Sequence, residues 1–197
     1  MAIVWPTALG VEQYATAGRN VDVPRLGCPG CKEPMSFWGW YERDLRVGRS
    51  QPLLVRRQRC KTCAASHAVL PSFMAHGRLD AIGVIGPALE AMVAGHARRA
   101  ADALGLPYTT VRDWRRRFVA RAEMLAIGFA RACVALGAPV PRLSGEAVAV
   151  ALKALGAAWR AARRRWGPGV GHLWRFANGL TGGHLLTTNI NPPWSST

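Results

Sequence analysis

Hydrophobic positions recur at helical spacing after residue 80. Ile82, Ile85 and Leu89 fall on one face of a predicted helix that ends before Gly95. Pro87 lies inside this pattern and either kinks the helix or begins a new one as its first residue. The segment therefore predicts one helix, or two short helices, with a single apolar face.

Two further helices are expected directly downstream. The pattern predicts a short helix over 97–104, a turn at 105–107 and a longer, basic helix over 109–126. Cys133 lies in the apolar stretch that follows, where a small buried side chain is its default role. This part of the chain is therefore predicted to be helical.

One more helix is predicted after the Gly- and Pro-containing linker at 137–141. Its apolar positions recur at steps of 4, 3 and 4: Val148, Leu152, Leu155 and Trp159. Ser144 can cap its start, and three consecutive arginines precede a Gly-Pro-Gly stop. The remaining segment, 167–197, is rich in Gly, Thr, Asn and Pro, and we expect a flexible tail there.

The first part of the chain has a different pattern. Residues 1–25 show no clean period and are interpreted as an N-terminal arm. Aromatic residues at 36–41 and β-branched and long side chains at 53–59 flank the turn-forming segment 48–52. We expect two short strands joined by a loop.

Composition adds a strong positive charge to this picture. The 197 residues include 26 Lys and Arg against 11 Asp and Glu, so the formal net charge is +15, and half of the residues are hydrophobic. A globular chain with this charge favours a polyanionic partner. The last acidic residue is Glu146.

Membrane insertion and secretion are not expected. No stretch of roughly 18 residues is both apolar and uncharged, and the start of the chain lacks the basic residue of a signal peptide. We expect a cytoplasmic, nucleoid-associated protein whose thiols stay reduced.

Two CxxC pairs, Cys28/Cys31 and Cys60/Cys63, flank the predicted strands. Two residues between thiolates let both sulfurs face one ion, and two such pairs complete the tetrahedron of a structural Zn²⁺. Disulfides or redox chemistry are the alternatives. His67 is a candidate substitute ligand, although a loop or phosphate-contacting histidine is the preferred interpretation.

The predicted helices around residue 105 have the pattern of a helix-turn-helix. Ala101 is small where the two helices would cross, and Gly105 tolerates a positive φ in the turn. Val111 and Trp114 supply the inner face of the second helix. Such a motif places its second helix in the major groove of DNA.

Candidate DNA contacts follow from this helix and its neighbours. The predicted base-reading face comprises Tyr108, Thr109, Thr110, Arg112, Asp113 and Arg116. The predicted phosphate contacts are Arg115, Arg117, Arg121, Arg98, Arg99 and, from the strands, Arg56, Arg57 and Arg59. Asp113 has three candidate roles: pairing with Arg117, orienting Arg112, or accepting a hydrogen bond from cytosine.

Aromatic residues at Trp38, Trp40 and Tyr41 lie on the strand opposite the basic segment 56–61. They support nucleic-acid contact or single-strand stacking in one interpretation. In the other, which we prefer, they cover a small ribbon core. The run of arginines at 163–165 is either a second phosphate clamp or a solvated helix end.

Catalytic motifs are not found. The chain has no GxxxxGK[ST], GxSxG or HExxH sequence, and only two carboxylates follow the helix-turn-helix region. We therefore do not expect an enzyme.

The order CPGC, VRRQRCKTC, SHAVLPSF and LGLPYTTVRDWRRRF over roughly residues 25–125 resembles the N-terminal zinc-ribbon and helix-turn-helix region of insertion-sequence transposases. It is also similar to small stand-alone actinobacterial helix-turn-helix proteins. The resemblance implies DNA binding, at mobile-element ends or promoters, with Zn²⁺ held by the four cysteines. No room remains after this region for a transposase catalytic core, so a partner chain would have to supply that activity.

These observations predict a mainly α protein with a small β zinc ribbon, a three-helix core containing the helix-turn-helix, and a C-terminal helix. The expected organisation is an arm (1–25), a zinc ribbon (26–75), a helix-turn-helix domain (76–136), a linker and helix (137–166) and a tail (167–197).

The leading functional hypothesis is sequence-specific binding of double-stranded DNA, linked to a mobile element or to transcriptional regulation, by a monomer or a homodimer. The rivals are a non-catalytic accessory subunit or remnant of a transposase that works with a recombinase, a zinc-ribbon RNA binder and a purely structural zinc adaptor.

Overall fold

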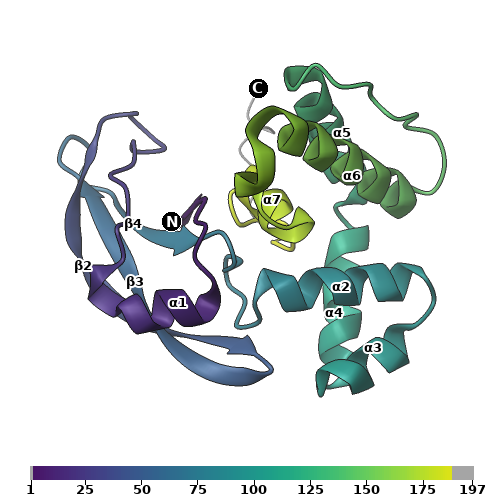
Figure 1. Ribbon diagram of the computed structural model, residues 1–197, viewed down its shortest axis with the longest axis horizontal. Coiled ribbons are helices and arrows are strands. Elements are labelled where there is room, and N and C mark those ends of the chain that lie inside the picture. Colours follow the sequence, from purple (N-terminus) through teal and green to yellow (C-terminus); the bar gives the residue numbers. More distant parts are fainter. Residues whose placement is uncertain (1, 188–197) are drawn as a thin grey trace.

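The computed structural model describes residues 2–187, which form a sheet lobe and a helical lobe (Figure 1). The strands are β1 (Ala2–Trp5), β2 (Met35–Val47), β3 (Arg49–Cys60) and β4 (Ser66–Pro71). The helices are α1 (Val11–Ala17), α2 (Ile82–Val93), α3 (Ala97–Leu104), α4 (Tyr108–Val119), α5 (Ala122–Ala135), α6 (Ala147–Trp166) and α7 (Leu173–Leu180), with short 3₁₀ turns at Gly18–Asn20 and Gly167–Val170.

The strands form one sheet in the order β1-β4-β3-β2. β2 and β3 make a long antiparallel hairpin, β4 adds antiparallel to β3, and β1 pairs in parallel with β4. The expected pair of short strands is thus half of a larger sheet. The chain is a mixed α/β protein and not a mainly α protein with a small ribbon.

Residues 1–25 are not an arm, since from residue 2 onward they belong to the sheet lobe. Trp5, Tyr14 and Val23 are buried in its core. The ring of Tyr14 on α1 meets that of Phe73 edge-on at 5.4 Å, and its hydroxyl donates to the backbone oxygen of Leu54 at 3.1 Å. These contacts fix α1 against the sheet.

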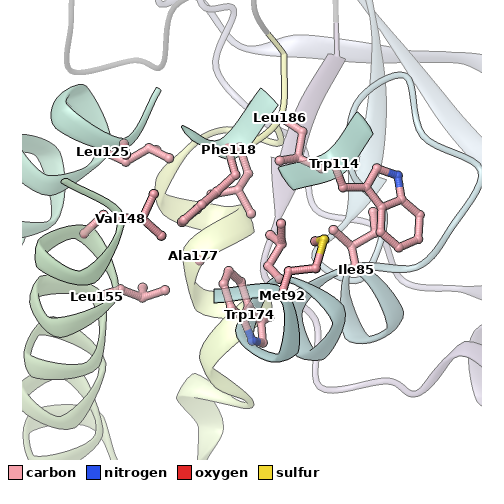
Figure 2. Packing of buried hydrophobic residues seen from close by; sticks show 14 of the residues in the cluster. Ile85, Met92, Trp114, Phe118, Leu125, Val148, Leu155, Trp174, Ala177 and Leu186 are labelled. Carbon is pink, nitrogen blue, oxygen red and sulfur yellow. The ribbon is translucent and has the colours of Figure 1, made fainter. Parts of the chain in front are cut away.

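In the helical lobe, apolar side chains from five helices converge on one core. Figure 2 shows Ile85 of α2, Phe118 of α4, Leu125 of α5, Leu155 of α6 and Trp174 of α7 around it. All five side chains are at least 95% buried. Helical spacing identified buried residues of α2 correctly, but of the predicted α6 positions Leu152 and Trp159 are only half-buried. The predicted helix over 109–126 is divided, because α4 ends at Val119 and α5 begins at Ala122.

The helices α2, α3 and α4 pack against one another at one end of this lobe. α2 continues through Pro87. α3 ends at Gly105, which adopts the left-handed conformation with a φ of 61°, and the amide of Leu106 donates to the carbonyl of Ala101 at 3.0 Å. Ala101 is buried, as its small size predicts.

The beginning of α6 differs from expectation by two residues. Glu146, and not Ser144, is the capping residue, and its carboxylate accepts a hydrogen bond from the amide of Ala149 at 2.8 Å. A carboxylate at this position also interacts favourably with the helix dipole.

The prediction of a flexible tail is wrong for residues 167–187. Trp174 and Asn178 of α7 are buried, and the amide group of Asn178 donates to the backbone oxygens of Ser72 and Met74 at 2.9 Å each. The Arg175 guanidinium donates to the carbonyl of Leu9. α7 therefore joins the two lobes, while residues 188–197 lie outside the described part.

Within residues 2–187, every helix is too short or too polar to cross a lipid bilayer.

Candidate metal centre and nucleic-acid interface

The four cysteines of the two CxxC pairs meet at one end of the sheet. Their Sγ atoms all lie within 4.8 Å of one another. The Sγ atoms of Cys28 and Cys63 are 3.6 Å apart, and those of Cys31 and Cys60 are 3.4 Å apart. All four are free thiols. Tetrahedral coordination with metal–sulfur distances of about 2.3 Å gives sulfur–sulfur distances of roughly 3.8 Å, so the cluster can hold a metal ion.

The two pairs have the same local backbone design. Each is followed by a non-glycine residue in the left-handed conformation, Lys32 with a φ of 67° and Ala64 with a φ of 58°. In both loops, the amide of the first cysteine donates to a carbonyl five residues later, that of Glu33 at 2.8 Å and that of Ala65 at 2.9 Å. These turns point both thiols of each pair toward one centre.

Backbone amides stabilise negative charge on the first sulfur of each pair. The N–H of Cys63 has the largest effect in lowering the pKa of Cys60 to about 6, followed by the Cys31 side chain and the N–H of Thr62. The N–H of Cys31 has the largest effect in lowering the pKa of Cys28. Because the thiolate is the metal-binding form, these amides prepare both sulfurs for a cation.

His67 lies beside the cluster without joining it. It sits in β4 and is 4% exposed, so it is neither a loop residue nor a surface contact for phosphate. Its Nε2 atom is 3.8 Å from Cys28 Sγ, and burial lowers the pKa of the ring. The four thiols already complete a ligand set, so His67 is not needed as a substitute.

The second candidate site is the outer face of α4. Its inner face is formed by the buried residues Val111, Trp114 and Phe118. The outer face exposes Tyr108, Thr109, Arg112, Arg115 and Arg116, with Thr110 half-buried. On α3, Arg98 and Arg99 are also exposed, and the Arg98 guanidinium lies over the Tyr108 ring at 5.8 Å.

Asp113 is engaged by arginines on its own helix. Its carboxylate accepts hydrogen bonds from Arg116 at 2.6 Å and from Arg117 at 2.7 Å, and lies 3.9 Å from the Arg78 guanidinium. The hydrogen bond from Arg117 is the largest influence that holds the Asp113 pKa below its ordinary value. Pairing with Arg117, one of its three expected roles, is what the structure shows.

Arg121 does not lie on this surface. It is 5% exposed, and its guanidinium donates to the backbone oxygen of Thr187. The sequence suggested a phosphate contact because Arg121 continues the arginine-rich stretch. In the structure α4 ends at Val119, and Arg121 turns inward at the start of α5.

The three arginines of β3 differ in exposure and in the contacts that they make. Arg59 is exposed, whereas Arg56 and Arg57 are half-buried. Arg57 donates to the Ser66 hydroxyl at 2.7 Å, while Arg56 and Arg59 stack on aromatic rings. Arg56 stacks on Phe37, which the sequence does not single out although Phe37 belongs to the aromatic segment 36–41.

Comparison with known proteins adds a limited result. The model of a family described as a domain of unknown function (DUF6431) matches residues 28–114, which is less than half of the chain. No curated protein and no solved structure matches this chain. The family match begins at the first cysteine and ends within α4, so it covers the four cysteines and the first part of α4 but not Arg115 and Arg116.

Proposed function

We propose that this chain is a zinc-stabilised, sequence-specific double-stranded DNA-binding protein in which α4 reads the major groove. The observation that carries the proposal is the two-faced character of α4. One face is anchored in the helical core by Val111, Trp114 and Phe118, and the other presents arginines and hydroxyl groups to solvent.

The arrangement of α3 and α4 supports a helix-turn-helix. The left-handed Gly105 between the two helices provides the tight turn, and buried Ala101 permits their close packing. In such motifs the first residues of the second helix meet base edges. Here those residues are Tyr108, Thr109 and Arg112, and arginine can bind guanine through two hydrogen bonds.

Charge supports nucleic acid as the partner. The net charge of +15 favours a polyanion, and the exposed arginines of α3 and α4 lie at one end of the helical lobe. Asp113 orients Arg116 and Arg117, so these two guanidinium groups are partly preorganised. We assign Arg117 to a phosphate contact and Arg116 to the base-reading face beside Arg112.

Zinc is the metal we assign to the four thiols. Four cysteine ligands at tetrahedral spacing suit Zn²⁺, and a full set of protein ligands is typical of structural sites. The zinc stabilises the end of the sheet, where Cys28, Met35 and Cys60 form only a very small buried cluster among the described residues. Its role in this proposal is to fold that end.

Selection from a random duplex DNA library tests the proposal. The zinc-loaded protein is used at about 150 mM salt, where exposed charges are screened over about 8 Å. We expect an enriched motif, whose symmetry also reports whether one chain or two bind. Arg112→Ala should reduce preference for the enriched motif by roughly 5- to 150-fold.

Arg142→Ala is the matched control, because Arg142 is exposed in the loop between α5 and α6. This variant should keep the motif. No enrichment from a folded, zinc-loaded sample would overturn the proposal, as would equal losses in the two variants.

A further inference from the structure

A second surface on the sheet lobe combines exposed aromatic rings with arginines. We call it the stacking platform and define it by Phe37, Trp38, Trp40, Arg25, Arg56 and Arg59. Trp38 is 58% exposed and Phe37 is 39% exposed. Large aromatic side chains with this exposure leave ring surface available to a ligand.

The arginines of the platform lie over its rings. The Arg56 guanidinium is 3.8 Å from the centroid of Phe37 and 4.4 Å from that of Trp40. Arg25 approaches Phe37 from the segment before the first cysteine pair, at 5.3 Å, and Arg59 lies 4.6 Å from Trp38. Stacking holds these cations in defined positions beside the exposed rings.

The backbone gives Trp38 its position. The β2–β3 register shifts between Phe37 and Gly39, so Trp38 is the extra residue of a bulge. It lines a hollow of about 400 Å³ together with Phe37, Arg59 and Lys61. The bulge therefore places an indole ring at the edge of a basic hollow.

None of the ion pairs among residues 2–187 that the structure shows involves Arg25, Arg56 or Arg59. A ligand that combines flat rings with anionic groups satisfies both features of the surface. Unpaired nucleotides do so, because each base offers a π-face and each linkage a phosphate.

We propose that the stacking platform binds single-stranded DNA, with a base stacked on Trp38 and phosphates held by Arg56 and Arg59. The bases of an intact duplex are stacked on each other and cannot reach Trp38. The choice of DNA over RNA rests on the proposed duplex-binding function of the same chain, whereas the stacking argument does not.

The platform and α4 lie on different lobes (Figure 1). A substitution in the platform should therefore weaken single-strand binding without changing duplex binding by α4, and a substitution in α4 should do the reverse. An acidic peptide could pair with the arginines, but it would leave the ring faces of Phe37 and Trp38 unused.

The test measures the anisotropy of a fluorescein-labelled 20-nucleotide oligo-dT titrated with the full, zinc-loaded chain. Trp38→Ala should raise the Kd by about 10-fold or more, because base–aromatic stacking contributes on this order for each base. Its affinity for a labelled 20-base-pair duplex should not change. Zinc content and far-UV circular dichroism establish that the variant is folded.

Trp166→Ala is the matched control. Trp166 is 61% exposed and has the Arg165 guanidinium 5.7 Å from a ring centroid, but it lies at the end of α6. Its removal should leave oligo-dT binding unchanged. Equal weakening in both variants, or no weakening in Trp38→Ala, would overturn the proposal.

Two further titrations separate the outcomes. Tighter binding of oligo-rU than of oligo-dT would overturn the assignment to DNA. Arg112→Ala should keep its affinity for oligo-dT. If no duplex motif can be selected but Trp38-dependent oligo-dT binding remains, the proposed role of α4 fails while the stacking platform stands.

Discussion

At the cysteine end of the sheet lobe, Cys28, Met35 and Cys60 are the residues buried together, whereas the helical lobe buries side chains from α2 through α7 in one continuous core. The first region cannot gain much from apolar burial. Four thiols that can hold a metal ion converge there instead, and in the proposed function a bound metal supplies the stabilisation. The helical lobe relies on close packing, so the two regions should respond to different perturbations.

Loss of one ligand should give the largest effect. Cys60→Ser leaves three thiols. Structural zinc sites in zinc-finger peptides bind the metal with apparent free energies of about 10–16 kcal/mol, and a site that loses one ligand should lose much of that stabilisation. We expect metal release and loss of amide protection in both cysteine loops, while the helical lobe keeps its protection. Metal analysis and hydrogen exchange measure the two responses.

Cys133→Ser is the matched control in the other lobe. The Cys133 thiol is buried in α5, 3.7 Å from the carbonyl of Ala154. The metal content should not change, and any destabilisation should appear in the helices. Metal loss in this variant would contradict the separation of the two regions.

Gly86→Ala should destabilise the helical lobe without changing the metal content. A Cβ atom on Gly86 would lie 2.0 Å from Cγ of Trp174, and the buried indole cannot move away freely. We expect a loss of about 3 kcal/mol in the free energy of unfolding, measured by denaturant titration.

Gly83→Ala is the matched substitution on the same helix, where a Cβ atom would meet no neighbour within 4 Å. It should be neutral or stabilising by up to about 1 kcal/mol. Adding Trp174→Ala to Gly86→Ala should give a smaller loss than the sum of the single variants, since the clash disappears. Additive losses would show that the clash is not the cause.

Ala64→Gly should strengthen the metal end modestly. Ala64 holds a φ of 58°, which costs an L-residue about 1 kcal/mol or more, and glycine removes that cost. We expect slower release of metal to a chelator and no change in the unfolding of the helical lobe. Gly77→Ala is the reverse test, because Gly77 has a φ of 66° outside the cysteine loops. Metal release should not change in that variant.

Asp113→Asn should have the smallest effect on stability, below about 1 kcal/mol, because the carboxylate is partly exposed. The hydrogen bond from Arg117 lowers the Asp113 pKa in the folded state. Its contribution is therefore present above the unfolded-state pKa and is lost as the pH falls through the lower, folded-state value. Wild type and variant should differ at pH 7 and converge in acid, as measured by urea unfolding. A difference that persists in acid would assign the effect to something other than this charge.

The sequence predicted those features that depend on local patterns. The cysteine spacing identified the four thiols, Val111 and Trp114 marked the buried face of α4, and Gly105 marked a left-handed turn. Each of these signals is contained within a short stretch of chain.

Features that depend on distant partners were missed. β1 has only four residues and is defined by its parallel pairing with β4. α7 lies in a segment rich in Gly, Thr, Asn and Pro, and its burial depends on the space that Gly86 leaves for Trp174. The inward turn of Arg121 depends on a carbonyl 66 residues away. Tertiary contacts decide all three. Only α7 has a local signature that could have been used, because Trp174, Ala177 and Leu180 lie at helical spacing.

The position of α7 also bears on how the protein is made. During translation the sheet lobe and helices α2 to α6 leave the ribosome before Trp174, Arg175 and Asn178, the residues that bridge the lobes. Until then Trp174 does not cover Gly86, and Arg175 does not lie over the ring of Phe73. A nascent chain from which α7 has not yet emerged therefore lacks these contacts, and chaperones and proteases have access to surfaces that α7 covers in the finished protein.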